Sequence, residues 1–258
     1  MICVGTAAWS VPRAVASHFP GEGTHLVRYA RVLPCAEINS SFYRSHSCVQ
    51  YARWAAMTPR DFRFSVKLPQ IITHEQRLRR ARRPLERFLA EVTGLGNKLG
   101  PLLIQLPPSA EFNMRAASNF LGLLRELYQG TVVCEPRHAS WFASRAERLL
   151  RAQRIGRVAA DPAKIAAAAT PGGWLESQQG GDAVVYYRLH GSPRVYWSQY
   201  SRQWIQLWAR ALRALPSASE AWCIFDNTAS GSAIENALEL QAALGSHTKI
   251  QRPRYRGR

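Results

Sequence analysis

The stretch Val132-Val133-Cys134-Glu135-Pro136-Arg137-His138-Ala139-Ser140-Trp141 changes character partway along its length. It begins as an apolar, β-branched run that is typical of a buried strand. Within the next four residues it adds a carboxylate, a guanidinium and an imidazole. A buried strand whose carboxyl end carries ionisable groups is how an α/β barrel presents its chemistry. A barrel of this kind requires other segments of the chain to repeat the same design.

Seven further apolar runs predict strands that alternate with helices. Counted with 131–135, the expected strands are 2–6, 36–40, 62–67, 101–106, 131–135, 157–161, 183–190 and 221–225. The expected helices are about 24–33, 49–57, 84–92, 114–128, 143–153, 201–215 and 235–244, with one further short helix in the Ala- and Gly-rich connection 162–181. Eight strands spaced about 30 residues apart predict an α/β fold, a single-domain (β/α)8 barrel of the TIM type.

The barrel is expected to occupy residues 1–250, and residues 251–258 form a basic C-terminal tail. A doubly wound open sheet is the alternative fold, but no G-x-G-x-x-G or Walker sequence follows any expected strand. The chain has no run of eighteen apolar residues, so we expect no membrane segment. With Met1 as the native start, the N-terminus reads as a strand and not as a signal peptide, which predicts a cytoplasmic protein.

The net charge and the cysteine content indicate which kinds of partner and metal site the chain favours. Lys and Arg number 34 against 17 acidic residues, a formal net charge of +17, which favours anionic partners. A genome rich in G and C that supplies arginine everywhere is an equal explanation. The five cysteines are widely spaced and form no C-x-x-C pair, which favours buried thiols over disulfides or a zinc site.

Polar side chains mark the carboxyl ends of seven of the eight expected strands. In chain order they are Glu37 and Asn39, Lys67, Gln105, Glu135 with Arg137 and His138, Asp161, Arg188 with His190, and Asp226 with Asn227. Residues two apart in a strand share a face. Positions such as Phe64 and Leu189 must face the helices, so their polar neighbours are expected to point into the barrel mouth. Two interpretations compete there, a ligand site and a mutually neutralising structural network, and the number of polar strand ends favours the ligand site.

The favoured function is an enzyme, a hydrolase or lyase, acting on a small anionic substrate, a class that includes phosphorylated compounds. Glu135 or Glu37 would be the base, His190 the acid or electrophile, and Asp161 a further carboxylate for acid–base work. Arg137 and Arg188 would clamp the anion. The other candidate substrate contacts are Asn39, Tyr43, Lys67, Gln105, His138, Tyr196, Asp226 and Asn227.

Three alternatives stay open. Oxygen and imidazole ligands from several strands suit a divalent metal, which is less favoured because no H-E-x-x-H or similar spacing occurs. Nucleic acid is the second partner class, through the basic cluster 77–83 and the basic and aromatic loop 191–200. A barrel that binds a metabolite without turnover is the third. The sequence specifies neither the metal nor the oligomeric state.

Several of these stretches resemble the YecE-like family, a family of domains of unknown function. They are GTAAWS at 5–10, EINSSFY at 37–43, FRFSVK at 62–67, ITH at 72–74, LGPLLIQLPPS at 99–109, EPRHASW at 135–141 and YRLHG at 187–191. The resemblance runs nearly end to end and implies a TIM-type barrel, but no reaction. The chain departs from the family at Pro136, where an aromatic residue is usual, at Ala139, where proline is usual, and at Asp226, where asparagine is common.

Overall fold

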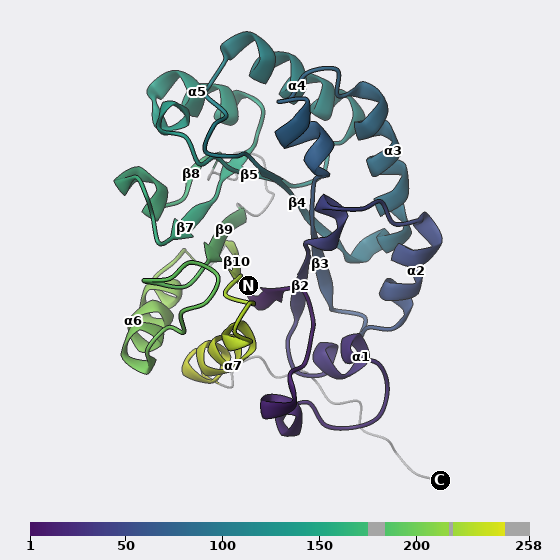
Figure 1. The fold of residues 1–258 in the computed structure, drawn as a ribbon, viewed down its shortest axis with the longest axis vertical. Coiled ribbons are helices and arrows are strands. Elements are labelled where there is room, and N and C mark those ends of the chain that lie inside the picture. The colour runs from purple at the N-terminus through teal and green to yellow at the C-terminus, as the bar shows by residue number, and fades with distance from the viewer. Residues whose placement is uncertain (175–183, 217–218, 246–258) are drawn as a thin grey trace.

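The structure, a computed structural model, describes residues 1–174, 184–216 and 219–245 (Figure 1). The predicted basic tail, 251–258, lies outside the described residues. The strands are β1 (Ile2–Ala7), β2 (Cys35–Ile38), β3 (Arg63–Lys67), β4 (Leu99–Gln105), β5 (Val132–Glu135), β6 (Gly156–Arg157), β7 (Ala159–Asp161), β8 (Gly172–Gly173), β9 (Val184–Leu189) and β10 (Glu220–Phe225).

The α-helices alternate with these strands, as predicted. They are α1 (His25–Ala30), α2 (Cys48–Ala56), α3 (Arg82–Val92), α4 (Met114–Leu127), α5 (Ser144–Ala152), α6 (Arg202–Arg213) and α7 (Ser232–Ala243). Short helical turns occupy the connections: η1 (Arg13–His18), η2 (Ser40–Phe42), η3 (Ile71–Glu75), η4 (Thr93–Lys98), η5 (Ala139–Phe142) and η6 (Ala166–Ala169). The short helix expected in the connection 162–181 is η6.

The sheet is a nearly closed parallel barrel, which confirms the predicted fold class. The pairing order is β7-β9-β10-β1-β2-β3-β4-β5-β6, and β8 adds a short antiparallel pair to β6. The predicted sixth strand is split at Val158: β6 pairs with β5, and β7 pairs with β9. The two halves of one strand therefore connect the two ends of the sheet, and the amide of Val158 donates to the carbonyl of Cys134 at 2.8 Å.

Helix starts follow from local sequence. Ser47, Asn113 and Ser201 precede α2, α4 and α6, and the side chain of each accepts a hydrogen bond from a backbone amide in the first turn. Such caps satisfy amides that the helix itself leaves without partners. The caps place each helix directly after the connection from the preceding strand, so the helices form the outer layer of the barrel (Figure 1).

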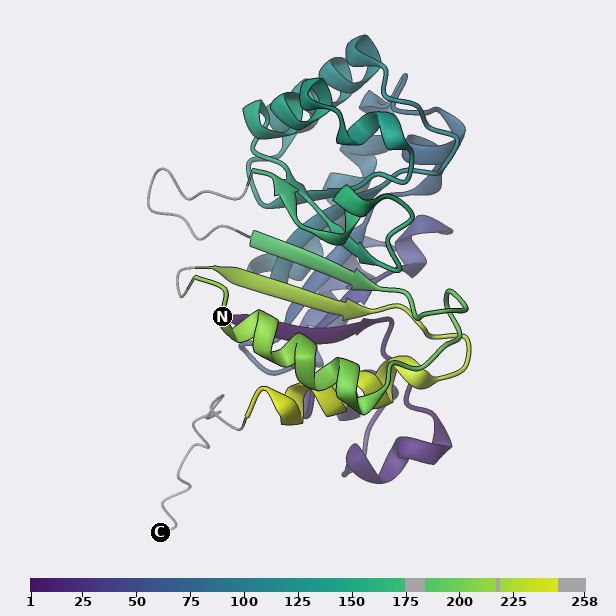
Figure 2. The same ribbon diagram turned by 90° about the vertical axis from the view of Figure 1, so that its left-hand side faces the viewer.

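The strands present alternate residues to two cores. Phe64, Val66 and Leu189 belong to the outer core against the helices, as alternation predicted. Val133, Trp222 and other buried side chains fill the barrel interior. Figure 2 shows β9, β10 and β1 side by side and pointing the same way, so their carboxyl ends open on the face seen in Figure 1. The polar strand ends therefore meet above the apolar interior.

Candidate active site at the carboxyl end of the barrel

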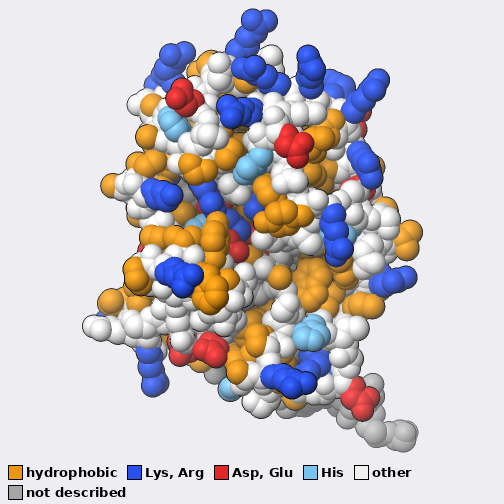
Figure 3. All heavy atoms as spheres, in the orientation of Figure 1, with side chains coloured by type: hydrophobic (Ala, Val, Ile, Leu, Met, Phe, Trp, Pro, Cys, Tyr) orange, Lys and Arg blue, Asp and Glu red, His pale blue; other side chains and the backbone are white. Residues whose placement is uncertain are grey.

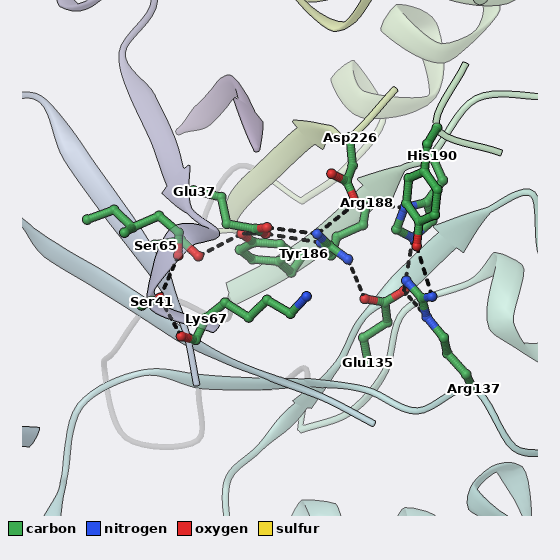
Figure 4. Close-up of polar contacts among 12 residues, drawn as sticks. Glu37, Ser41, Ser65, Lys67, Glu135, Arg137, Tyr186, Arg188, His190 and Asp226 are labelled. Atoms are coloured by element: carbon green, nitrogen blue, oxygen red, sulfur yellow. Dashed lines mark hydrogen bonds and ion pairs between the residues drawn. The ribbon is translucent and has the colours of Figure 1, made fainter. Parts of the chain in front are cut away.

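Seven ionisable side chains gather at this mouth (Figure 4). Five are nearly or completely buried at strand ends: Glu37 on β2, Lys67 on β3, Glu135 on β5, Arg188 on β9, and Asp226 directly after β10. His190, which follows β9, is also buried, and Arg137 lies two residues beyond β5. Figure 3 looks onto the same face and shows it hollowed near its middle, with basic and acidic side chains on the wall of the hollow.

Arg188 is the centre of the cluster. Its side chain is fully buried and spans three carboxylates that come from three other strands. Nε and Nη2 donate to Glu37 at 3.0 and 2.8 Å, Nη1 donates to Glu135 at 2.7 Å, and Nη2 donates to Asp226 at 2.9 Å. Burial alone would lower the pKa of the guanidinium, but the three carboxylates raise it well above its usual range.

Glu135 and Asp226 are held in their ionised form. Burial alone would raise the pKa of Glu135, but Arg188, Arg137 and His190 together lower it well below the ordinary value. Asp226 behaves in the same way: burial opposes ionisation, and Arg188 and His190 lower its pKa. Charged hydrogen bonds of this kind stabilise the carboxylate more than the acid.

His190 lies between two of these carboxylates. Nε2 is 2.9 Å from Glu135, and Nδ1 is 3.0 Å from Asp226. Since both acceptors are ionised, both ring nitrogens carry protons and the ring is an imidazolium. Burial alone would lower the pKa of His190, but its carboxylate partners raise it. The Tyr196 ring packs edge-on against the imidazole, with centroids 5.6 Å apart.

Two neutral hydroxyl groups, those of Tyr186 and Ser65, form a hydrogen-bonded chain that ends on Glu37. The Tyr186 hydroxyl donates to Glu37 at 2.9 Å and is 2.7 Å from the Ser65 hydroxyl. Burial raises the pKa of Tyr186, and the nearby Glu37 charge raises it further. Tyr186 was not among the sequence candidates. It lies two residues before Arg188, so strand alternation pointed to the same inward face.

Arg137 forms the outer edge of the cluster. Its Nη2 lies 3.2 Å from Glu135, and its Nη1 donates to the Tyr196 hydroxyl at 3.0 Å. A quarter of the Arg137 side chain remains exposed, in contrast to Arg188. Arg137 and Tyr196 are therefore members of the cluster that a molecule entering the mouth can reach.

Lys67 differs from the other charged members. Its Nζ lies 3.9 Å from the centroid of the Phe42 ring and has no hydrogen-bond or ion-pair partner among the described residues. Figure 4 shows this amine pointing toward Arg188 and Glu135 without reaching either. Lys67 is 6% exposed. Burial, followed by the Arg188 charge, lowers its pKa to about 8, although the three carboxylates oppose the change.

The cluster has an excess of cationic groups. Three carboxylates face Arg188, Arg137, the His190 imidazolium and Lys67. The first three cations balance the three carboxylates. A protonated Lys67 then gives the cluster a net charge of +1, and no anionic group of the described residues contacts its amine. An anion next to Lys67 would restore neutrality.

Other predicted residues lie apart from the cluster. Asp161 accepts a hydrogen bond from the Tyr200 hydroxyl at 2.7 Å and so anchors the aromatic loop. His138 caps η5 and lies 3.9 Å from Glu111. Tyr43 is 68% exposed at the rim.

The predicted amide side chains also serve the surrounding structure. Asn227 donates to the Ser198 carbonyl at 2.9 Å and to Asn236 at 3.0 Å, which ties the aromatic loop to α7. Gln105 donates to the Leu106 carbonyl at 3.0 Å. The Oδ1 atoms of Asn39 and Asn227 are buried without partners in the part of the chain that the structure describes.

No group of three or more His, Cys, Asp or Glu residues within the described ranges is arranged to hold a metal ion. The carboxylates of the mouth are instead turned onto Arg188 and His190. Among the same residues, no helix has the length and apolar character needed to cross a membrane.

The fold and this cluster define a (β/α)8-barrel protein with an ionic site at the carboxyl mouth. Residues 3–257 match the family described as "Protein of unknown function DUF72". The chain belongs to this family, which confirms the resemblance of its motifs to the YecE-like proteins.

Similarity to individual proteins supports the same family. The "UPF0759 protein YecE" of Escherichia coli K12 is 32% identical over 176 residues, which cover 65% of this chain and 62% of that protein. The match thus spans less than two thirds of that relative. Two crystal structures of DUF72 family proteins share the fold. The one from Enterococcus faecalis V583 has 22% identity, a TM-score of 0.75 and coverage of 95% of each chain. The one from Thermotoga maritima MSB8 has 24% identity and a TM-score of 0.73, covering 95% of this chain and 99% of that one.

Proposed function

We propose that the chain is an enzyme, a hydrolase or lyase, that acts on a small anionic substrate at the carboxyl mouth of the barrel. The observation that carries this proposal is the Lys67 amine, which is buried beside an ionic cluster and has no partner among the described residues. A structural network would satisfy its own members. The cluster does so for Arg188 and His190 and leaves Lys67 for a ligand.

The geometry revises the roles expected from sequence. The four charged hydrogen bonds of Arg188 occupy most of its donors, so Arg188 positions the carboxylates and does not clamp the substrate. Anion binding falls to Lys67 and Arg137. Glu135 is a weak base because its pKa is lowered. The neutral amine of Lys67, which is populated near pH 8, is the better proton acceptor. The His190 imidazolium is the candidate donor, and it must release a hydrogen bond to Glu135 or Asp226 to give up a proton.

Binding of simple anions tests this proposal. Inorganic phosphate, phosphoglycolate and oxalate would be titrated against the full chain by calorimetry at low salt. We expect at least one of them to bind, and Lys67→Met to weaken that binding about 10-fold or more. The control is Lys164→Met. Lys164 is an exposed lysine after β7, so this change removes the same charge without touching the cluster. Equal binding by wild type and Lys67→Met would contradict the proposal.

A second candidate function, binding of single-stranded nucleic acid, rests on the loop 191–200. The Arg194 guanidinium lies 4.5 Å from the Trp197 ring, and Trp197 is 46% exposed. An exposed aromatic ring with an adjacent cation can stack a base and contact its phosphate. Affinity for a single-stranded oligonucleotide should then fall steeply as salt rises, and Trp197→Ala should weaken it. A weak, salt-independent response would remove this candidate.

A further inference from the structure

We propose that the substrate is a small carbonyl compound that carries an anionic group, and that Lys67 forms an imine with its carbonyl carbon. This inference rests on the proposed function and assigns Lys67 a covalent role in it. The alternative role for Lys67 is that of a permanently charged anion-binding group.

The surroundings of Lys67 are those of a nucleophile. An ammonium is stable in a protein interior when it donates to several acceptors. Lys98 shows this arrangement, since its Nζ donates to the carbonyls of Ala55 and Thr58, each at 2.6 Å, and to the Thr58 hydroxyl at 3.0 Å. Lys67 has none of these contacts within the described ranges, and its Nζ lies against the Phe42 ring. Desolvation and a neighbouring cation, here Arg188, are the two features that activate amine nucleophiles in proteins.

The Arg188 charge and burial both favour the neutral amine, and the pKa of Lys67 falls to about 8. At pH 7 the neutral fraction is then about 300-fold that of an ordinary lysine. Lys67 lies at the carboxyl mouth and keeps 6% of its surface exposed. The lone pair needed for attack on a carbonyl carbon is therefore present and can be reached.

The remaining members of the cluster fit the later steps. Attack forms the N–C bond and moves the carbonyl electron pair onto oxygen, and a proton then passes from the nitrogen to that oxygen to give a neutral carbinolamine. A second proton on the oxygen, for which the His190 imidazolium is the candidate donor, lets the C–O bond break as the nitrogen lone pair forms the C=N bond, and water leaves. The product is an iminium ion. The carboxylates of Glu37, Glu135 and Asp226 oppose the lowering of the Lys67 pKa, so they stabilise positive charge at this nitrogen.

Arg137 and Tyr196 lie at the exposed side of the cluster, where the anionic group of the substrate would bind. An iminium withdraws electrons from the adjacent carbon. The site would therefore assist removal of a proton, or cleavage of a bond, at the carbon next to the former carbonyl. Cleavage of a bond at that carbon is a lyase reaction, so this step belongs to the lyase half of the proposed function.

Reductive trapping tests the inference. The full chain would be incubated at pH 8 with pyruvate, glyoxylate or dihydroxyacetone phosphate in the presence of cyanoborohydride. The reagent delivers a hydride to an iminium and leaves a stable secondary amine. Peptide mapping by mass spectrometry then gives the rate of modification at each lysine. We expect Lys67 to be modified at least about 10-fold faster than Lys164 or Lys98 with one of these probes, and the rate to rise as the pH is raised from 6 to 9.

Lys67→Arg is the matched variant, because it keeps a cation and cannot form the adduct. Its remaining adducts should fall only on other lysines. Modification of Lys67 no faster than Lys164, in a protein that binds the same probe by calorimetry, would overturn the imine and leave the proposed function standing. Absence of both binding and adduct with all three probes would count against both proposals.

Discussion

Lys67→Met is expected to make the protein more stable at neutral pH while it weakens anion binding. Methionine keeps an unbranched apolar side chain of similar length but removes the ammonium. The pKa of Lys67 falls from 10.5 to about 8, chiefly through burial. Between these two values the unfolded chain binds more protons than the folded chain, so the stability of the wild type rises with pH. The charged amine therefore destabilises the fold by about 3 kcal/mol at pH 7 and about 2 kcal/mol at pH 9.

The contact of the ammonium with the Phe42 ring offsets part of this cost, by about 0.5–1 kcal/mol. The expected gain for Lys67→Met is then about 2 kcal/mol at pH 7 and about 1 kcal/mol at pH 9. Urea unfolding at both pH values measures it. Lys164→Met is the control. Lys164 is exposed, so its replacement should change the free energy of unfolding by no more than about 0.5 kcal/mol at either pH.

Two results would refute this reasoning. One is a Lys67→Met variant that is no more stable than wild type at pH 7, which would mean that the ammonium has compensating contacts. The other is a gain that does not shrink between pH 7 and pH 9, which would mean that packing and not charge causes it. A stabilised variant that no longer binds anions would be the expected sign of a residue kept for function at the expense of stability.

Three further outcomes are expected. Arg188→Met should cost about 3–5 kcal/mol in urea unfolding, because it leaves three buried carboxylates without their shared cation; a cost below about 1 kcal/mol would contradict the role of Arg188 as the centre. In the wild type, the lowered pKa of Glu135 contributes stability that is present above its ordinary pKa and lost as the pH falls through the lowered value. The raised pKa of His190 contributes stability that is present below its ordinary pKa and lost as the pH rises through the raised value. Glu135→Gln should weaken both slopes in unfolding curves measured across pH. Asp161→Ala should release the Tyr200 hydroxyl and speed proteolysis within the loop 191–200, and unchanged cleavage would show that the loop does not depend on this anchor.

Much of the site followed from local pattern. Alternation correctly placed Lys67, Arg188 and His190 on the inner face, because a strand turns successive side chains to opposite sides. It also pointed to Tyr186, which sequence reasoning passed over because tyrosine is as common in cores as in sites. The same reasoning gathered Asp161 and His138 into the mouth. In the structure the Asp161 side chain, at the end of β7, accepts from the Tyr200 hydroxyl, and His138, which follows β5, caps η5.

The sequence by itself determined the barrel and the side on which its chemistry lies. Strand period, helix caps and polar strand ends are local features, and each acts over a few residues. Only the tertiary structure decided which charges neutralise one another. Glu37 and Arg188 pair across 151 positions of the chain. Among the residues that the structure describes, Lys67 has no partner, because the three carboxylates turn to a guanidinium that reaches all of them. This pairing of charges depends on distances across the nearly closed barrel, and those distances are set only when β1 pairs with β10.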